Sequence, residues 1–251
     1  MSQLELNKQT RTQLMPKVFF NGPAGRIEGK FVESQDEKAP IALVLHPHPQ
    51  YGGTMDNKVV YNMYKTLHEN GYTVLRINFR GVGNSVGEYD NGIGEMTDAA
   101  TALDWLRVKY PLSQQTLIAG FSFGAWIAMQ LIMRRPEITD FLAVSPPVTN
   151  HDFSFLSPCP IPGLIVQGDK DSVVSEEAVN DLAQRLVKQK NTNIHYRVIE
   201  GADHFFRDKI DFMNEEIDTY LKSSSSPNNY QSSNAEDTES QSSETRRIFL
   251  D

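Results

Sequence analysis

The apolar positions of the chain follow two alternating patterns along most of its length. Short, mainly apolar runs, such as residues 41–45 and 163–167, are typical of strands that are buried on both faces of a sheet. Between such runs, apolar residues recur at helical spacing, as in residues 96–106. Because strands and helices alternate, the pattern predicts an α/β fold with a mostly parallel sheet and helices on both faces.

Turn and capping residues set the expected limits of these elements. Gly22 and Gly25 bound a turn between the first two strands, which would form an antiparallel edge of the sheet. Asp56 and Ser175 are expected to cap two helices. The expected strands are residues 17–21, 26–33, 41–45, 72–79, a run ending at 120, 140–145, 163–167 and 194–199, and the expected helices are residues 56–70, 96–110, 125–131, a helix beginning at 175 and a last one ending near 222.

The composition divides the 251-residue chain into three parts. Residues 1–16 are a polar leader, and residues 17–222 carry the alternating pattern of one α/β domain. From residue 223 onward, nine of the last 29 residues are Ser and most of the others are polar or acidic. We expect this tail, residues 223–251, to be disordered, because it has too few apolar residues to build a core.

Charge and cysteine content exclude several classes of protein. The formal net charge is −8 and no stretch is rich in Lys and Arg, so we expect no nucleic-acid partner. No apolar run approaches the length of a membrane span, which predicts a soluble, cytoplasmic protein without a membrane partner. Cys159 is the single cysteine, so an internal disulfide cannot form. The oligomeric state is left open, with a homodimer as one option.

Ser122 lies in the motif that most clearly indicates chemistry. It is the centre of Gly120-Phe-Ser-Phe-Gly124, which follows an apolar strand and precedes a helical pattern. This context is typical of a nucleophile elbow, a sharp turn that exposes a serine at the carboxyl edge of a sheet. The flanking glycines leave room for the tight turn, and the helix N-terminus favours a developing negative charge. The sequence therefore predicts that Ser122 is a nucleophile.

A serine nucleophile needs a histidine base and a carboxylate that orients the base. Asp171 and His204 each follow a predicted strand, and their order after Ser122 is the one expected for an elbow serine on such a sheet. Asp169 could also face His204, but we expect it to bond main-chain N–H groups within its own turn. The prediction is an Asp171-His204-Ser122 triad.

The carbonyl oxygen of a substrate needs two N–H donors as it becomes negatively charged. The first is expected from Phe123, the residue after the nucleophile. The second is expected from the loop after residues 41–45, where Pro47 and Pro49 have no N–H and His48 is the nearest donor. We therefore predict an oxyanion hole formed by the main chain of Phe123 and His48.

A zinc site is the alternative reading of the same loop. His46 and His48 could both bind a metal, but a hydrolytic site needs a third ligand, and only His151 with Asp152 follows a suitable strand. We favour loop packing for these histidines, so neither a metal nor another cofactor is expected.

Five stretches together resemble the α/β-hydrolase superfamily, and more narrowly small bacterial hydrolases with little cap that are distantly similar to dienelactone hydrolases and to prolyl-oligopeptidase-type catalytic domains. The resemblance implies an α/β-hydrolase fold with an eight-stranded sheet, and the Asp-His-Ser triad at Asp171, His204 and Ser122. It covers most of residues 17–222 and leaves the tail without a counterpart. The stretches are His-Pro-His-Pro-Gln-Tyr-Gly-Gly-Thr-Met at 46–55, Asn-Phe-Arg-Gly-Val-Gly-Asn-Ser at 78–85, Gly-Phe-Ser-Phe-Gly at 120–124, Gly-Asp-Lys-Asp at 168–171 and Gly-Ala-Asp-His at 201–204.

These observations predict a carboxylesterase-like serine hydrolase that cleaves an ester or thioester of a small or medium acyl substrate through an acyl-enzyme. Two alternatives remain open. The first is a non-catalytic hydrolase-like domain that binds a partner, although a binding domain has no need of all three triad residues. The second is an amidase or peptidase similar to prolyl oligopeptidase.

Overall fold

The structure is a computed structural model that describes residues 16–189 and 193–224. Most of the expected leader and the tail from residue 225 lie outside the described residues. The described residues form eight strands, five α-helices and one short 3₁₀ helix, in the order β1 (Lys17–Gly22), β2 (Gly25–Val32), β3 (Ile41–Leu45), η1 (Pro49–Tyr51), α2 (Lys58–Glu69), β4 (Thr73–Ile77), α3 (Ile93–Lys109), β5 (Thr116–Phe121), α4 (Phe123–Ile132), β6 (Asp140–Val144), β7 (Gly163–Gly168), α5 (Glu176–Val187), β8 (Ile194–Ile199) and α6 (Ile210–Ser224).

All eight described strands belong to one mixed sheet, in the order β1-β2-β4-β3-β5-β6-β7-β8. The first two strands are antiparallel to their neighbours, and every pair from β4 to β8 is parallel. The predicted antiparallel edge and parallel centre are therefore confirmed. Because the central strands run in the same direction, their carboxyl ends meet at one edge of the sheet.

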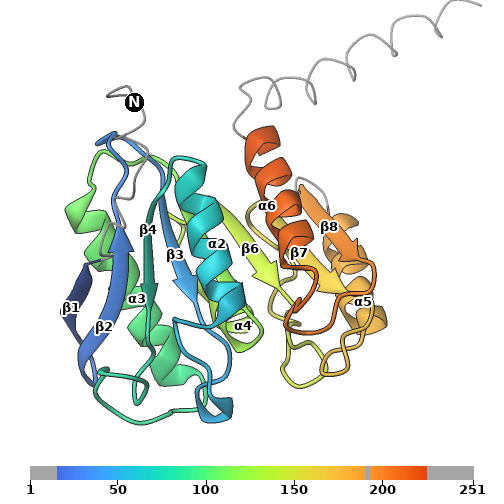
Figure 1. The fold of residues 1–251 in the computed structure, drawn as a ribbon, viewed down its shortest axis with the longest axis horizontal. Coiled ribbons are helices and arrows are strands. Elements are labelled where there is room, and N and C mark those ends of the chain that lie inside the picture. The colour runs from blue at the N-terminus through green and yellow to red at the C-terminus, as the bar shows by residue number, and fades with distance from the viewer. Residues whose placement is uncertain (1–15, 190–192, 225–251) are drawn as a thin grey trace, which may run out of the picture.

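Helices cover both faces of the sheet. Figure 1 shows α2 and α6 in front of the strands and α3, α4 and α5 behind them. The strand β3 explains how one sheet serves two layers, since all five of its residues are buried. Leu43 packs into the layer beneath α3 and α4, whereas Ala42 and Val44 pack into the layer beneath α2 and α6. A continuous apolar run therefore forms a strand that has no solvent-facing side.

Two expected limits of helices differ from the structure. The N-cap of α2 is Asn57, whose side chain accepts a hydrogen bond from the Val59 N–H, and not Asp56. Asp56 instead forms ion pairs with Lys30 at 2.7 Å and with Arg76 at 3.0 Å. The sequence did not reveal this because both partners come from distant strands. The helix α6 continues to Ser224, beyond its expected end near residue 222.

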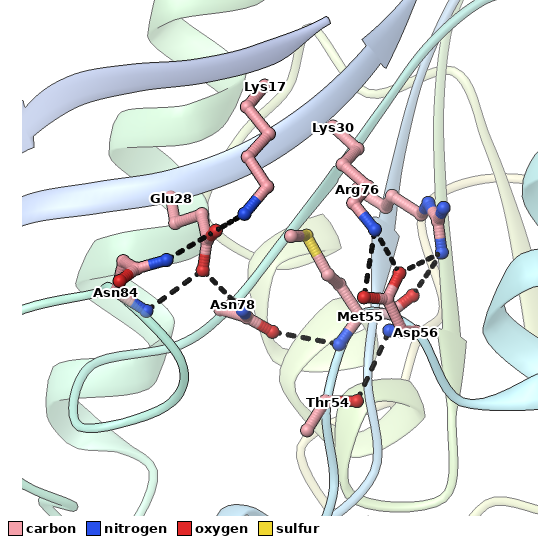
Figure 2. A network of polar contacts seen from close by, with 9 residues as sticks. All are labelled: Lys17, Glu28, Lys30, Thr54, Met55, Asp56, Arg76, Asn78 and Asn84. Atoms are coloured by element: carbon pink, nitrogen blue, oxygen red, sulfur yellow. Dashed lines mark hydrogen bonds and ion pairs between the residues drawn. The ribbon is translucent and has the colours of Figure 1, made fainter. Parts of the chain in front are cut away.

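A buried polar network joins the loop before α2 to the loop after β4 (Figure 2). The Asn78 side chain accepts from the Met55 N–H at 2.9 Å and donates to Glu28 Oε2 at 2.9 Å. Glu28 also accepts from the Asn84 main chain and side chain, and burial, which favours its neutral form, is outweighed by these hydrogen bonds, so its pKa falls to about 2. The network thereby fixes two of the loops at the carboxyl edge of the sheet.

Candidate active site

Ser122 occupies the sharp turn between β5 and α4. Its backbone has φ 52° and ψ −119°, in the left-handed half of φ space that non-glycine residues rarely adopt. The Ser122 N–H donates to the Val144 carbonyl at 2.8 Å, which ties the turn to β6. The side chain therefore sits at the carboxyl edge of the sheet and at the N-terminus of α4, in the conformation that the sequence predicts for a nucleophile elbow.

The two glycines that flank Ser122 allow the chain to pass close to itself. A Cβ atom on Gly120 would overlap the backbone of Gly124. A Cβ atom on Gly124 would lie 2.7 Å from the His46 carbonyl oxygen and would also overlap the Leu45 carbonyl. The elbow is thus in direct contact with the end of β3, and both glycines of the motif are required sterically.

The structure brings Ser122, His204 and Asp171 together from three separate loops. His204 Nε2 lies 3.2 Å from Ser122 Oγ, and His204 Nδ1 lies 2.7 Å from Asp171 Oδ2. A carboxylate can only accept, so Nδ1 carries the proton and Nε2 is free to accept the hydroxyl proton of Ser122. His204 is 5% exposed and the Asp171 side chain is fully buried.

Asp171 is held by four hydrogen-bond donors. Its Oδ1 accepts from the Val173 and Val174 N–H groups at 2.8 Å each, and its Oδ2 accepts from His204 and from the Gln167 amide, the latter at 2.9 Å. Burial raises the pKa of a carboxyl group, but the hydrogen bonds from His204 and from these N–H groups outweigh it, and the pKa of Asp171 is lowered. The group is therefore ionised and fixed in orientation.

Asp169 has a different position from Asp171. Its Oδ1 accepts from the Gly201 N–H at 2.6 Å, and its Oδ2 lies 3.4 Å from Lys170 Nζ. The expectation that Asp169 bonds main-chain N–H groups is correct in kind, but the donor belongs to the loop that carries His204 and not to its own turn. Asp169 therefore joins the two loops that present Asp171 and His204.

The predicted oxyanion donors lie on adjoining segments. Neither the His48 N–H nor the Phe123 N–H has a hydrogen-bond acceptor among the described residues. The ring centroids of the two side chains are 4.9 Å apart, and Gly124 packs on the carbonyls that precede the His48 loop. The Phe123 N–H is thus at the N-terminus of α4, next to Ser122 in the chain, and the His48 loop contacts the Phe123 side chain.

The His46 side chain is turned into the protein. Its Nε2 accepts from the Phe79 N–H at 3.0 Å and its Nδ1 lies 2.6 Å from the Pro47 carbonyl, so both ring nitrogens are engaged. Burial favours the neutral ring and lowers its pKa to about 4. Within residues 16–189 and 193–224, no three His, Cys, Asp or Glu side chains are grouped as metal ligands would be. His46, one of the histidines that suggested zinc, is thus held by packing and hydrogen bonds within the protein.

Gln167 and several aromatic residues near Ser122 were not identified from the sequence. Gln167 is the last residue but one of β7 and is fully buried, which is unusual for an amide. The signal in the sequence was a Gln at the end of an otherwise apolar run. Tyr89 lies in the Gly-rich loop after β4, and its hydroxyl is 3.1 Å from His48 Nε2. No local pattern indicates that contact, because it depends on how two loops meet.

The comparisons with known proteins agree with the fold. The family model of X-Pro dipeptidyl-peptidase (S15 family) matches residues 33–154, a region that contains Ser122 and ends before Asp171 and His204. The uncharacterized protein RP471 of Rickettsia prowazekii is 62% identical over 211 residues, which are 82% of this chain and 89% of that protein.

Two solved structures are similar over nearly all of their length. ATU1826 of Agrobacterium tumefaciens is a protein of unknown function that has been assigned to the α/β hydrolases. It is 51% identical to this chain with a TM-score of 0.80, over 82% of this chain and 95% of that chain. XC6422 of Xanthomonas campestris, an α/β serine hydrolase without a lid, is 30% identical with a TM-score of 0.73, over 83% and 94% of the two chains. The chain belongs to the α/β-hydrolase superfamily.

The connections between the strands of this chain are consistent with an α/β hydrolase that has no lid, as in XC6422. The segment between β6 and β7 contains turns and no helix, so nothing in it forms a helical cap over the carboxyl edge. None of the described helices has the length and apolar content needed to cross a bilayer.

Proposed function

We propose that the chain is a serine hydrolase that cleaves an ester or thioester of a small or medium acyl substrate through an acyl-enzyme. The observation that carries this proposal is the line of contacts from Asp171 through His204 to Ser122 at the carboxyl edge of the sheet. A domain that only binds a partner has no need of an ionised, buried carboxylate that orients a histidine toward a strained serine.

In the first half of the reaction, Ser122 Oγ attacks the substrate carbonyl carbon while its proton passes to His204 Nε2. The main-chain N–H groups of Phe123 and His48 bind the resulting oxyanion. The imidazolium, stabilised by Asp171, then donates its proton to the leaving oxygen or sulfur as the bond to the acyl carbon breaks.

In the second half, water attacks the acyl-enzyme and gives a proton to His204. Collapse of this second tetrahedral intermediate returns the proton to Ser122 Oγ and releases the carboxylic acid. Every proton is carried by His204, so the proposed reaction needs no metal and no other cofactor.

A fluorophosphonate probe tests whether Ser122 is activated, because the probe forms a covalent bond with the nucleophile of serine hydrolases. We expect labelling at Ser122, and Ser122→Ala should abolish it and lower kcat on a p-nitrophenyl ester by about 10⁴-fold or more. Ser145→Ala is the matched control, since Ser145 also has a positive φ of 45° at the end of the neighbouring strand. Labelling that persists in Ser122→Ala would contradict the proposal.

Peptide hydrolysis is the second candidate, and the match to the S15 family model favours it. An amide differs from an ester in that its leaving nitrogen must be protonated, and His204 can donate that proton as well. A p-nitrophenyl butyrate assay beside an Ala-Pro p-nitroanilide assay decides between them. We expect the ester to be cleaved with the larger kcat/KM, and the reverse ranking would assign the chain to the peptidases.

A further inference from the structure

A group of aromatic rings surrounds Phe123, the residue next to Ser122. The ring centroid of Phe123 lies 4.9 Å from that of His48, 5.7 Å from that of Trp126 and 6.0 Å from that of His151. We call the rings that meet here the aromatic cluster: His48, Tyr51, Tyr89, Phe123, Trp126 and His151.

The cluster is open to solvent on its outer side. Phe123 is buried and forms its base, whereas Tyr89, Trp126 and His151 are only partly buried and Tyr51 is 87% exposed. Trp126 and His151 are stacked with their centroids 4.1 Å apart, which fixes both rings. Rigid, partly exposed rings beside a nucleophile can bind a planar group by stacking or edge contacts.

The cluster and the base lie on opposite sides of the elbow. Phe123 packs in the core layer beneath α3 and α4, against Tyr89 and Trp126. The ring of His204 instead contacts Phe121, which packs in the layer beneath α2 and α6. Because the leaving atom must reach His204 Nε2 to be protonated, the leaving group lies on the α2 and α6 side. The acyl group then extends the other way, toward the aromatic cluster.

Tyr89 adds a polar contact at the same place. His48 Nδ1 accepts from the Gln50 N–H at 3.2 Å, so the neutral ring carries its proton on Nε2 and donates it to the Tyr89 oxygen. Burial lowers the pKa of His48, which favours this neutral form. The Tyr89 O–H has no acceptor among the described residues, and it can donate to an oxygen on a bound ring.

We propose that the substrate carries a planar conjugated acyl group of the aroyl or arylacryloyl type, held by the aromatic cluster; this inference rests on the proposed serine hydrolase activity. Hydrolysis breaks the bond between the acyl carbon and the leaving oxygen. Water supplies the hydroxyl of the released aromatic acid, and the leaving group departs as an alcohol.

Two p-nitrophenyl esters with the same number of acyl carbons, the cinnamate and the nonanoate, test this directly because their leaving group is identical. We expect kcat/KM to be higher for the cinnamate, and Trp126→Leu should reduce the cinnamate-to-nonanoate ratio by about three- to tenfold. Trp126→Phe keeps a ring and should retain most of the preference. Phe212→Leu, which removes an exposed ring on α6 outside the cluster, should not change the ratio.

Binding is read separately from hydrolysis in Ser122→Ala combined with Trp105→Phe, where Trp126 is the remaining tryptophan. We expect cinnamate to quench its fluorescence at lower concentration than nonanoate does. Activity on p-nitrophenyl acetate with a preference for the nonanoate, or a preference that Trp126→Leu leaves unchanged in a folded protein, overturns the inference alone. A wild-type protein that cleaves none of these esters and takes no fluorophosphonate overturns the proposed function, and the quenching experiment then decides whether the cluster binds aromatic acids.

Discussion

The Gln167 amide donates to Asp171 Oδ2 at 2.9 Å, the same oxygen that accepts from His204 at 2.7 Å. Gln167 also donates to the Val174 carbonyl at 3.1 Å, on the loop whose N–H groups bind Asp171 Oδ1. Gln167 is fully buried, so its position does not depend on solvent. The orientation of the candidate catalytic carboxylate is thus set by a residue of β7 that does not itself reach Ser122 or His204.

We expect Gln167→Met, which removes the amide at similar volume, to lower kcat by roughly 10- to 100-fold with little change in KM. The estimate follows from the value of one hydrogen bond to a charged group, about 1.5–3 kcal/mol. Proton NMR provides a direct readout, because the downfield resonance of the His204 Nδ1 proton should move or broaden in the variant.

Gln189→Met is the matched control for this variant. The Gln189 side chain accepts from the Cys159 N–H at 2.6 Å and donates to the Leu156 carbonyl at 3.0 Å, so it also joins two loops but does not contact the triad. Its loss should lower Tm without moving the His204 resonance. If both variants lower kcat equally and neither moves the resonance, Gln167 has only a structural role.

Gly124→Ala should destabilise the fold through backbone overlap. The new Cβ would lie 2.7 Å from the His46 carbonyl oxygen, and neither partner can move without displacing the end of β3. We expect a loss of about 1–3 kcal/mol and a lower Tm in thermal denaturation. Gly71→Ala separates overlap from strain, since Gly71 has φ 90° but no atom within 4 Å of its added Cβ. Gly124 itself has no positive φ, so its loss measures overlap alone, and a Gly124→Ala variant as stable as wild type would show that overlap contributes nothing.

The fold and the proximity of Asp171, His204 and Ser122 could be predicted from the sequence because each depends on a local pattern. A run of five buried residues in β3, two glycines around Ser122 and the order of loops along a parallel sheet are all visible in one dimension. Gln167, Tyr89 and the partners of Asp56 were not predictable, because their contacts join segments that are distant in the chain. Such contacts depend on side-chain packing between loops, which leaves no periodic signal in the sequence.

His46 should make the stability depend on pH. Its pKa is about 4 in the folded protein, because burial disfavours the charged ring, against 6.5 for an unperturbed histidine. Above pH 6.5 the ring is neutral in both states and the stabilisation is complete. As the pH falls from 6.5 to 4, the unfolded chain binds a proton that the folded protein does not, so the free energy of unfolding decreases, by about 3 kcal/mol for this group.

Urea denaturation of wild type and His46→Gln between pH 4 and pH 7 measures this contribution as a difference. A difference is needed because Asp140, whose pKa burial raises to about 7, contributes the opposite slope in the same range. The amide keeps a donor and an acceptor for the Pro47 carbonyl and the Phe79 N–H. Parallel pH profiles of the two proteins would mean that His46 does not titrate with a lowered pKa.

The two acids of the loop after β7 should have separable effects. Asp171→Asn keeps the shape of the side chain but removes the charge that stabilises the imidazolium, and its amide can leave His204 in the wrong tautomer. We expect kcat on a p-nitrophenyl ester to fall by about 10⁴-fold, with a much smaller effect on Tm. Asp169→Ala removes the acceptor of the Gly201 N–H, a bond between the two loops that carry Asp171 and His204.

Loss of the hydrogen bond between Gly201 and Asp169 should cost about 1 kcal/mol of stability. It should lower kcat far less than Asp171→Asn does, because the contact of His204 with Asp171 Oδ2 remains. Steady-state kinetics and thermal denaturation of both variants, each beside wild type, give the comparison. A 10⁴-fold loss in Asp169→Ala together with a mild effect in Asp171→Asn would assign the orienting acid to Asp169. The hydrogen bond at 2.7 Å between His204 Nδ1 and Asp171 Oδ2 is the reason to expect the opposite.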